Sequence, residues 1–169
     1  MNKVAMFEKV SFVQFKKDWQ TLYQDSDEKI KEIYEKIKLP QRATKGSAGY
    51  DFFLPIDYLF KPKEKIKIPT GIRVRINEGW VLQLFPRSSL GFKYGLKLSN
   101  TVGIIDSDYY NSDNEGHMFM SMVNDNDEGL SIDLKQGNAI VQGIFVPFGI
   151  TIDDAADGIR NGGFGSTNK

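Results

Sequence analysis

The first 39 residues carry apolar side chains at the spacing expected of amphipathic helices. Two stretches, 11–23 and 25–39, each place an apolar stripe along one helical face. The stripes consist of Phe12, Phe15, Trp19, Leu22 and Tyr23, and of Ile30, Ile33, Tyr34 and Ile37. Because little chain separates the two stretches, the pattern predicts a helical hairpin, which we assign as an N-terminal extension over residues 1–38.

Residues that start and stop helices flank both stretches. Ser11 followed by Gln14, and Asp25 followed by Glu28, match the capping box that begins a helix. Pro40 cannot continue the second helix, so we expect that helix to end before it.

From residue 41 onward the helical period gives way to alternation. Short segments of alternating apolar and polar residues are separated by turn formers, as at 77–79 and 124–129. The segments are KIKIP (65–69), GIRVRI (71–76), WVLQLF (80–85), HMFMSMV (117–123), LSIDL (130–134) and AIVQGIFVPF (139–148). Many short strands at close spacing predict an all-β fold, either an antiparallel sandwich or a barrel.

Composition narrows the possible partners. The chain has 169 residues, a formal net charge of +0 and no cysteine. Without a global positive field, nucleic-acid binding is not expected, whereas a small anion needs only a few local cations and amides. The chain start lacks the apolar run of a signal peptide, and no later run approaches a membrane span. We therefore expect a soluble cytoplasmic protein that binds neither nucleic acid nor membrane.

Two segments offer charged groups next to glycines or in bends. Asp51 stands in an apolar stretch and must be hydrogen-bonded or near a cation if it is buried; otherwise it is a turn aspartate. Arg87, Ser88 and Ser89 follow a strand and a proline, and offer a guanidinium, two hydroxyls and amides to an anion. The alternative for this second segment is a capped turn with a surface arginine.

The stretch 98–110 is the most informative one for chemistry. Asp106 follows an apolar strand and could deprotonate a water, and with Asp108 it could form a metal pair if both lay on a strand. Asn100 carries both a donor and an acceptor, which can match the edge of a nucleobase. The alternative is a polar hairpin loop. His117 is the only histidine and is expected to be structural or exposed.

The chain ends in NGGFGSTNK (161–169), a glycine-rich segment with one aromatic residue. Such a backbone can wrap phosphates with its amides, and Phe164 could stack on a flat ring. The alternative is a disordered end without a function.

Taken together, five stretches resemble the motifs of the trimeric dUTPase family in their order along the chain. They are SAGYDFF (47–53), PRSSLG (86–91), SNTVGIIDSDYY (99–110), GNAIVQGIFVP (137–147) and RNGGFGST (160–167). The resemblance covers roughly residues 39–169 and implies a distorted jelly-roll or β-barrel core over 39–157 with a tail over 158–169 that closes the active site. It also implies a homotrimer with active sites at the subunit interfaces, and Mg²⁺-assisted hydrolysis of dUTP to dUMP and diphosphate.

The resemblance also implies roles for single residues in the pocket. Asp106 would be the base that activates water, and Asn100 would contact uracil together with backbone extending toward Phe119. Tyr109 would pack on the deoxyribose and reject a ribose hydroxyl. Ile104 and Ile105 would belong to the same substrate-binding segment.

Other residues would bind the phosphates or close the site. The implied phosphate contacts are Arg87, Ser88, Ser89 and Gln142. Asp51 would support the metal indirectly, through water. The residues of the closing tail would be Arg160, Phe164, Gly165, Ser166 and Thr167.

Four features depart from the family pattern. Ala139 stands where the fourth motif usually carries a basic residue, and Arg160 is one residue closer to the tail glycines than in many members. The stretch NSDNEGH (111–117) is longer than the family's link, and we expect it to enlarge a loop beside the pocket. The helical hairpin lies outside the family core, where it either adds packing or binds a protein partner. Two other functions stay open: a dCTP deaminase of the same fold, which needs a pocket glutamate, and a non-catalytic nucleotide-sensing regulator.

Overall fold

The structure is a computed structural model that describes residues 2–158, 160 and 162. The helices are α1 (Phe12–Gln20), α2 (Asp27–Lys36) and α3 (Ser88–Tyr94), with a 3₁₀ helix η1 (Ser107–Asn111). The first six strands are β1 (Ala5–Lys9), β2 (Gln41–Arg42), β3 (Tyr50–Phe53), β4 (Tyr58–Phe60), β5 (Lys65–Pro69) and β6 (Ile72–Ile76). The others are β7 (Trp80–Pro86), β8 (Leu96–Leu98), β9 (Gly103–Ile105), β10 (Phe119–Asn124), β11 (Ile132–Leu134) and β12 (Ala139–Pro147).

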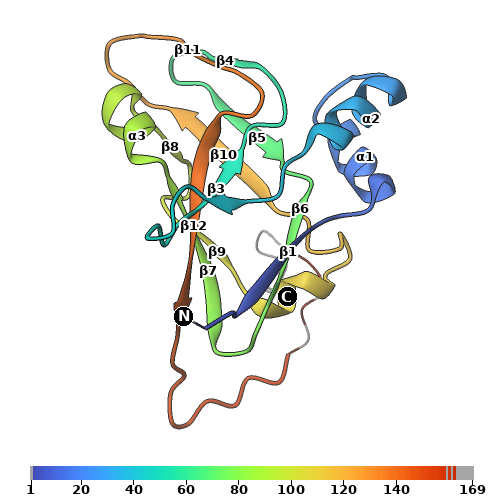
Figure 1. The fold of residues 1–169 in the computed structure, drawn as a ribbon, viewed down its shortest axis with the longest axis vertical. Helices are drawn as coiled ribbons and strands as arrows, with labels where there is room; N and C mark the ends of the chain where they lie inside the picture. Colours follow the sequence, from blue (N-terminus) through green and yellow to red (C-terminus); the bar gives the residue numbers. More distant parts are fainter. Residues whose placement is uncertain (1, 159, 161, 163–169) are drawn as a thin grey trace.

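All strand pairs are antiparallel, and among the described residues they form four sheets. The largest has the order β2-β3-β12-β7-β9, and a second has the order β5-β10-β8. Two-stranded sheets pair β1 with β6 and β11 with β4. The predicted mostly β, jelly-roll-like fold is confirmed, in an open form in which the strands curve around one interior without closing a single barrel (Figure 1).

The predicted helical hairpin is confirmed, with a correction to its second cap. Ser11 Oγ accepts the amide of Gln14 at 3.1 Å and begins α1 as expected. The cap of α2 is Ser26 rather than Asp25, because Asp25 instead accepts the indole N–H of Trp19 at 2.9 Å. Because the Asp25 carboxylate is engaged in this tertiary contact, the neighbouring Ser26 caps the helix instead.

The N-terminal segment contains a strand that the helical pattern did not reveal. Strand β1 pairs with β6 from Ala5 opposite Ile76 to Lys9 opposite Ile72. The ring of Phe7 lies 5.6 Å from that of Phe52. Five residues are too few for alternation to stand out beside two long helical stripes.

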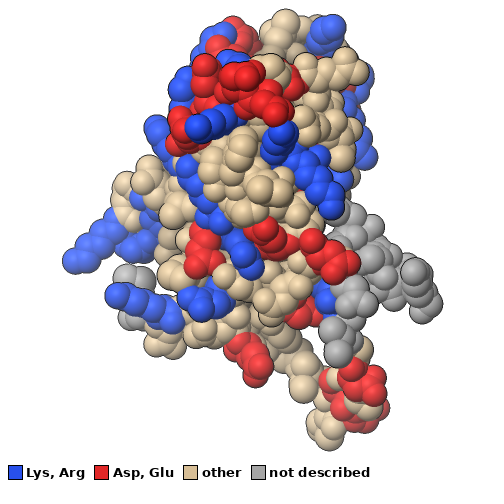
Figure 2. Space-filling model, turned by 90° about the vertical axis from the view of Figure 1, so that its right-hand side faces the viewer, with Lys and Arg blue, Asp and Glu red and all other residues tan. Residues whose placement is uncertain are grey.

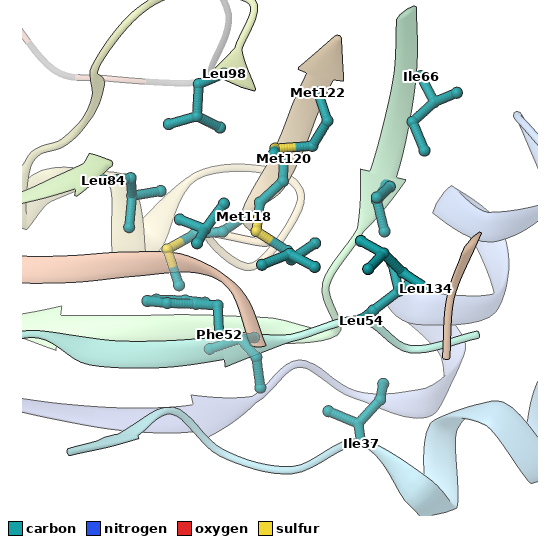
Figure 3. Close-up of a cluster of buried hydrophobic side chains, with 14 of the residues drawn as sticks. Ile37, Phe52, Leu54, Ile66, Leu84, Leu98, Met118, Met120, Met122 and Leu134 are labelled. Carbon is teal, nitrogen blue, oxygen red and sulfur yellow. The ribbon is translucent and has the colours of Figure 1, made fainter. Parts of the chain in front are cut away.

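One apolar core joins the hairpin to the sheets. Met118, Met120 and Met122 alternate along the chain into β10, and all three side chains point into the interior (Figure 3). Ile37, which follows α2, enters the same cluster, and Phe15 of α1 is fully buried in it. The hairpin is therefore part of the folded unit and not an appended arm.

Charge is spread over the outer surface on the side that carries the hairpin. Figure 2 shows Lys and Arg interspersed with Asp and Glu over this face, in keeping with the net charge of +0. In the part of the chain that the structure describes, no helix combines the length and apolar character needed to cross a bilayer.

We expect Gly71→Ala to destabilise the contact between hairpin and sheet. Gly71 has a φ of +72°, and a Cβ there would lie 2.3 Å from Ile37 Cδ1 and 3.4 Å from Phe15 Cδ2. Gly79→Ala is the matched control, since Gly79 has a φ of +78° with no heavy atom near its Cβ position. Overpacking should lower the free energy of unfolding of Gly71→Ala by about 1–3 kcal/mol more than that of Gly79→Ala, as measured by urea denaturation. Equal losses would show that Gly71 matters only for its backbone conformation.

Candidate functional site

A pocket of about 500 Å³ lies where the connection between β8 and β9 meets the start of β10. Seven of the sequence-predicted site residues line it together: Asn100, Ile104, Ile105, Asp106, Tyr109, Phe119 and Arg160. The other described lining residues are Lys65, Leu84, Leu98, Ser99, Val102, Gly103, Met118, Ser121 and Gly162. Prediction missed these, although strand alternation places Ser121 on the same face as Phe119.

A strained turn presents Asn100 to the pocket. The amide of Val102 donates to the carbonyl of Asn100 at 2.7 Å, and Thr101 between them has a φ of 68°. This is the γ-turn form with a positive central φ, which is rare and strained. Next to it, Ser99 Oγ donates to the carbonyl of Ser121 at 3.0 Å and ties this turn to β10.

Two carboxylates at the pocket share one arginine. Arg160 Nη2 lies 2.6 Å from Asp106 Oδ2, and Arg160 Nε lies 3.1 Å from Asp108 Oδ1. Asp106 begins η1 after β9 has ended, so the strand needed to align the two aspartates as a metal pair is absent at this point. The arginine that the resemblance assigned to the closing tail thus has carboxylates as its partners in this structure.

Tyr109 forms a rigid wall of the pocket. Its side chain is 5% exposed, and its hydroxyl donates to the carbonyl of His117 at 2.7 Å. The hydroxyl also accepts from Asn114 Nδ2 at 3.0 Å. Burial raises the pKa of the Tyr109 phenol, with an opposing effect of the Asn114 hydrogen bond, so the hydroxyl stays protonated at neutral pH.

The residues predicted to bind phosphates and Asp51, predicted to support the metal through water, form a separate cluster. Arg87 Nε lies 3.4 Å from Asp51 Oδ1. Gln142 on β12 pairs with Asp51 on β3 in the sheet register. Ser88 and Ser89 open helix α3, which replaces the predicted bend, and Arg87 is its N-cap. None of these five residues lines the pocket of Asp106.

Four of the predicted tail residues, Phe164, Gly165, Ser166 and Thr167, lie outside the described residues. Among the residues that are described, no group of three or more His, Asp or Glu side chains is placed to hold a metal ion. His117 proves to be fully buried, which agrees with the structural role expected of it.

The fold and the pocket define a mostly β, jelly-roll-like protein with an acidic group beside a ligand-sized cavity. The family profile described as dUTPase matches residues 35–168. The chain is 47% identical over 134 residues to the deoxyuridine 5'-triphosphate nucleotidohydrolase of Lactococcus lactis, covering 78% of this chain and 88% of that protein. The dUTPase crystal structure from Streptococcus mutans has a TM-score of 0.64 and 37% identity, covering 88% of this chain and 98% of that one.

A more distant structure shares the fold. The dUTPase from phage phi11 of S. aureus has a TM-score of 0.64 at 20% identity, covering 93% of this chain and 98% of that one. With the profile matching most of the chain, this protein belongs to the dUTPase family.

We expect Thr101→Gly to stabilise the protein. Glycine adopts a positive φ without the steric cost that threonine meets, and the Thr101 side chain is exposed, so little packing is lost. Glycine loses more conformational entropy on folding, which offsets part of the relieved strain. The net rise in the free energy of unfolding should be about 0.5–1 kcal/mol. Thr101→Ala is the control, because it keeps Cβ and with it the strain. Denaturant titration that gives the same gain for both variants would show that the turn is unstrained.

Proposed function

We propose that this protein hydrolyses dUTP to dUMP and diphosphate, with Asp106 as the base that activates the attacking water. The observation that carries the proposal is the position of Asp106 in one pocket with Asn100 and Tyr109. That pocket therefore contains an amide that can pair with a nucleobase, a ring that can pack on a sugar, and a carboxylate. In-line attack on a phosphorus needs one base and positioning more than a dense set of catalytic side chains.

We further propose that the phosphates are bound by Arg87, Ser88, Ser89 and Gln142 from another copy of the chain, in a homotrimer, with Asp51 of the same cluster beside them. Two observations support this. The cluster and the Asp106 pocket have no lining residue in common within one chain. The segment after β12 also leaves Phe148, Ile150 and Ile152 exposed, and such an apolar run is typical of a surface that contacts another subunit.

Mg²⁺ fits this proposal as an ion held mainly by substrate phosphates and waters. Asp51 offers one carboxylate, largely shielded and 3.4 Å from Arg87, which suits an indirect contact through water better than a protein cage. When bound, the ion would neutralise negative charge along the triphosphate. A mutant of the dUTPase from phage phi11 of S. aureus coordinates a structural Mg(II) ion, which is a property of that protein.

Arg160 and the tail would complete the site. A triphosphate that enters next to Asp106 offers Arg160 a more highly charged partner than either aspartate does. Phe164, Gly165, Ser166 and Thr167 would then cover the base and phosphates, which excludes bulk water. The proposal keeps the cytoplasmic location expected from the sequence.

The described pocket lining disfavours the deaminase alternative. Deamination needs a glutamate at the base, and the described residues of this pocket include Asp106 but no glutamate. A nucleotide sensor would use the same binding residues without turnover, so only an assay separates it from an enzyme.

Asp106→Asn should retain dUTP binding and lose at least about 100-fold in kcat, because the amide cannot take a proton from water. Asp113→Asn, in the exposed part of the same loop, is the matched control and should keep full activity. Diphosphate release would be measured with dUTP, dTTP, dCTP and UTP, and nucleotide binding by calorimetry. Full turnover of Asp106→Asn would remove Asp106 from the base role. Ammonia from dCTP would favour the deaminase, and binding without release would favour the sensor.

Truncation after Asn161 tests the closing tail. Because no described core residue lies beyond this position, the thermal unfolding midpoint should stay unchanged while turnover falls strongly. The uncut chain is the control, and unaltered kcat and KM after truncation would mean that the tail has no part in the reaction.

A further inference from the structure

His117 connects the N-terminal helices to the rest of the fold through both of its ring nitrogens. The amide of Gly71 donates to Nε2 at 2.7 Å, so Nε2 is the unprotonated nitrogen. The proton is then on Nδ1, which lies 2.6 Å from Asp18 Oδ2. Helix α1 therefore holds the imidazole in one tautomer and one orientation.

Asp18 is well placed to act as this anchor. Its side chain is 14% exposed, and the same Oδ2 accepts a second hydrogen bond from Gln14 Nε2 at 2.9 Å. Burial acts to raise the pKa of Asp18, but the hydrogen bonds from His117 and Gln14 outweigh it and hold the pKa below its usual value. The carboxylate is thus ionised at neutral pH, and charge-assisted hydrogen bonds are the stronger ones.

The same histidine contacts two walls of the pocket. Its backbone carbonyl accepts hydrogen bonds from the Tyr109 hydroxyl at 2.7 Å and from the side-chain amide of Asn114 at 3.2 Å. Its ring lies 4.8 Å, centroid to centroid, from the ring of Phe119. Tyr109 and Phe119 both line the pocket, so a displacement of His117 reaches both.

A second contact joins α1 to the loop that carries Asn114. The carboxylate of Glu115 accepts the amide and the hydroxyl of Ser11, each at 2.7 Å. The lengthened loop at 111–117 is therefore fastened to the start of α1 by Glu115 and to its last turn by His117. The loop is thus joined to the helix at two points.

We propose that Asp18 is a positioning residue for substrate selection: through His117 it fixes Tyr109 and Phe119, and so sets how strictly the pocket rejects a ribose. The inference rests on the proposed function. It extends the specificity apparatus to α1, which lies before the segment that the dUTPase profile matches.

The physical consequence of losing Asp18 is local. Without its acceptor, the Nδ1–H of a fully buried imidazole has no partner, and a buried unsatisfied donor costs about 1–3 kcal/mol. A change of tautomer would relieve this donor but place a proton on Nε2 against the amide of Gly71. The ring must therefore shift in either case. Steric rejection of one hydroxyl depends on sub-ångström placement of the pocket wall. The preference for dUTP over UTP should therefore fall at a displacement that is too small to unfold the protein.

The test compares the ratio of kcat/KM for dUTP to that for UTP in three variants and the parent chain. Asp18→Ala is expected to lower this ratio about tenfold, mainly through a raised kcat/KM for UTP, because a displaced wall excludes the ribose hydroxyl less strictly. Asp18→Asn can still accept from Nδ1–H and should keep most of the ratio. Asp25→Ala is the matched control in the same hairpin: it removes the acceptor of the Trp19 indole, so it should lower thermal stability and leave the ratio unchanged.

A purely structural role for Asp18 would reduce turnover of both substrates equally, and an unchanged ratio in folded Asp18→Ala would overturn the proposal. Asn114→Ala removes a hydrogen bond to the Tyr109 hydroxyl and leaves the helical hairpin unchanged, and it should lower the ratio as well. If Asp18→Ala does not fold, the Asn114→Ala ratio decides. If the parent protein hydrolyses no nucleotide, the proposed function is wrong. Calorimetry would then measure the ratio of the affinities for dUMP and UMP in the same variants, and this ratio would decide the positioning role.

Discussion

The structure depends on the close approach of the helical hairpin to the turn between β5 and β6. Gly71 has no side chain at this point, so Ile37 and Phe15 pack directly against its backbone. The backbone N–H of Gly71 would be buried without a partner if it did not donate a hydrogen bond to the ring of His117. One glycine therefore meets two demands, dense apolar packing and a satisfied backbone donor. This contact thus holds the hairpin, the turn between β5 and β6 and the segment that leads into β10 next to one another.

Alternation predicted the long strands because each has one face on the core and one toward solvent. In β10 the buried methionines alternate with less buried neighbours, which gives a clear period of two. β1 was missed because it is short and owes its existence to pairing with β6, a partner far away in sequence. Likewise, the helix α3 replaces a predicted bend, since glycine and serine in RSSLGFKY weaken the local helical signal.

The part of the site that sequence could predict is the part that is local in the chain. Asn100, Asp106 and Tyr109 lie within ten residues and reach one pocket through the connection between β8 and β9 and a 3₁₀ turn. The separation of Arg87 from that pocket is a property of the fold and has no signature in local spacing. The link from Asp18 to Tyr109 was equally hidden, because it passes through His117, and the contact between Asp18 and His117 spans 99 residues of chain. A lone histidine gives no hint of its partners.

The ion pair between Arg160 and Asp106 has a consequence for the order of events on binding. Asp106 is 44% exposed, and partly exposed pairs contribute only about 0–1 kcal/mol because water screens them. So weak a pair restrains Arg160 only slightly. In the proposed mechanism a triphosphate, with several charges to offer, would displace the aspartate at small cost, so that release of Asp106 from the arginine would coincide with arrival of the phosphates. The carboxylate would then become available to water only when there is a phosphorus for that water to attack.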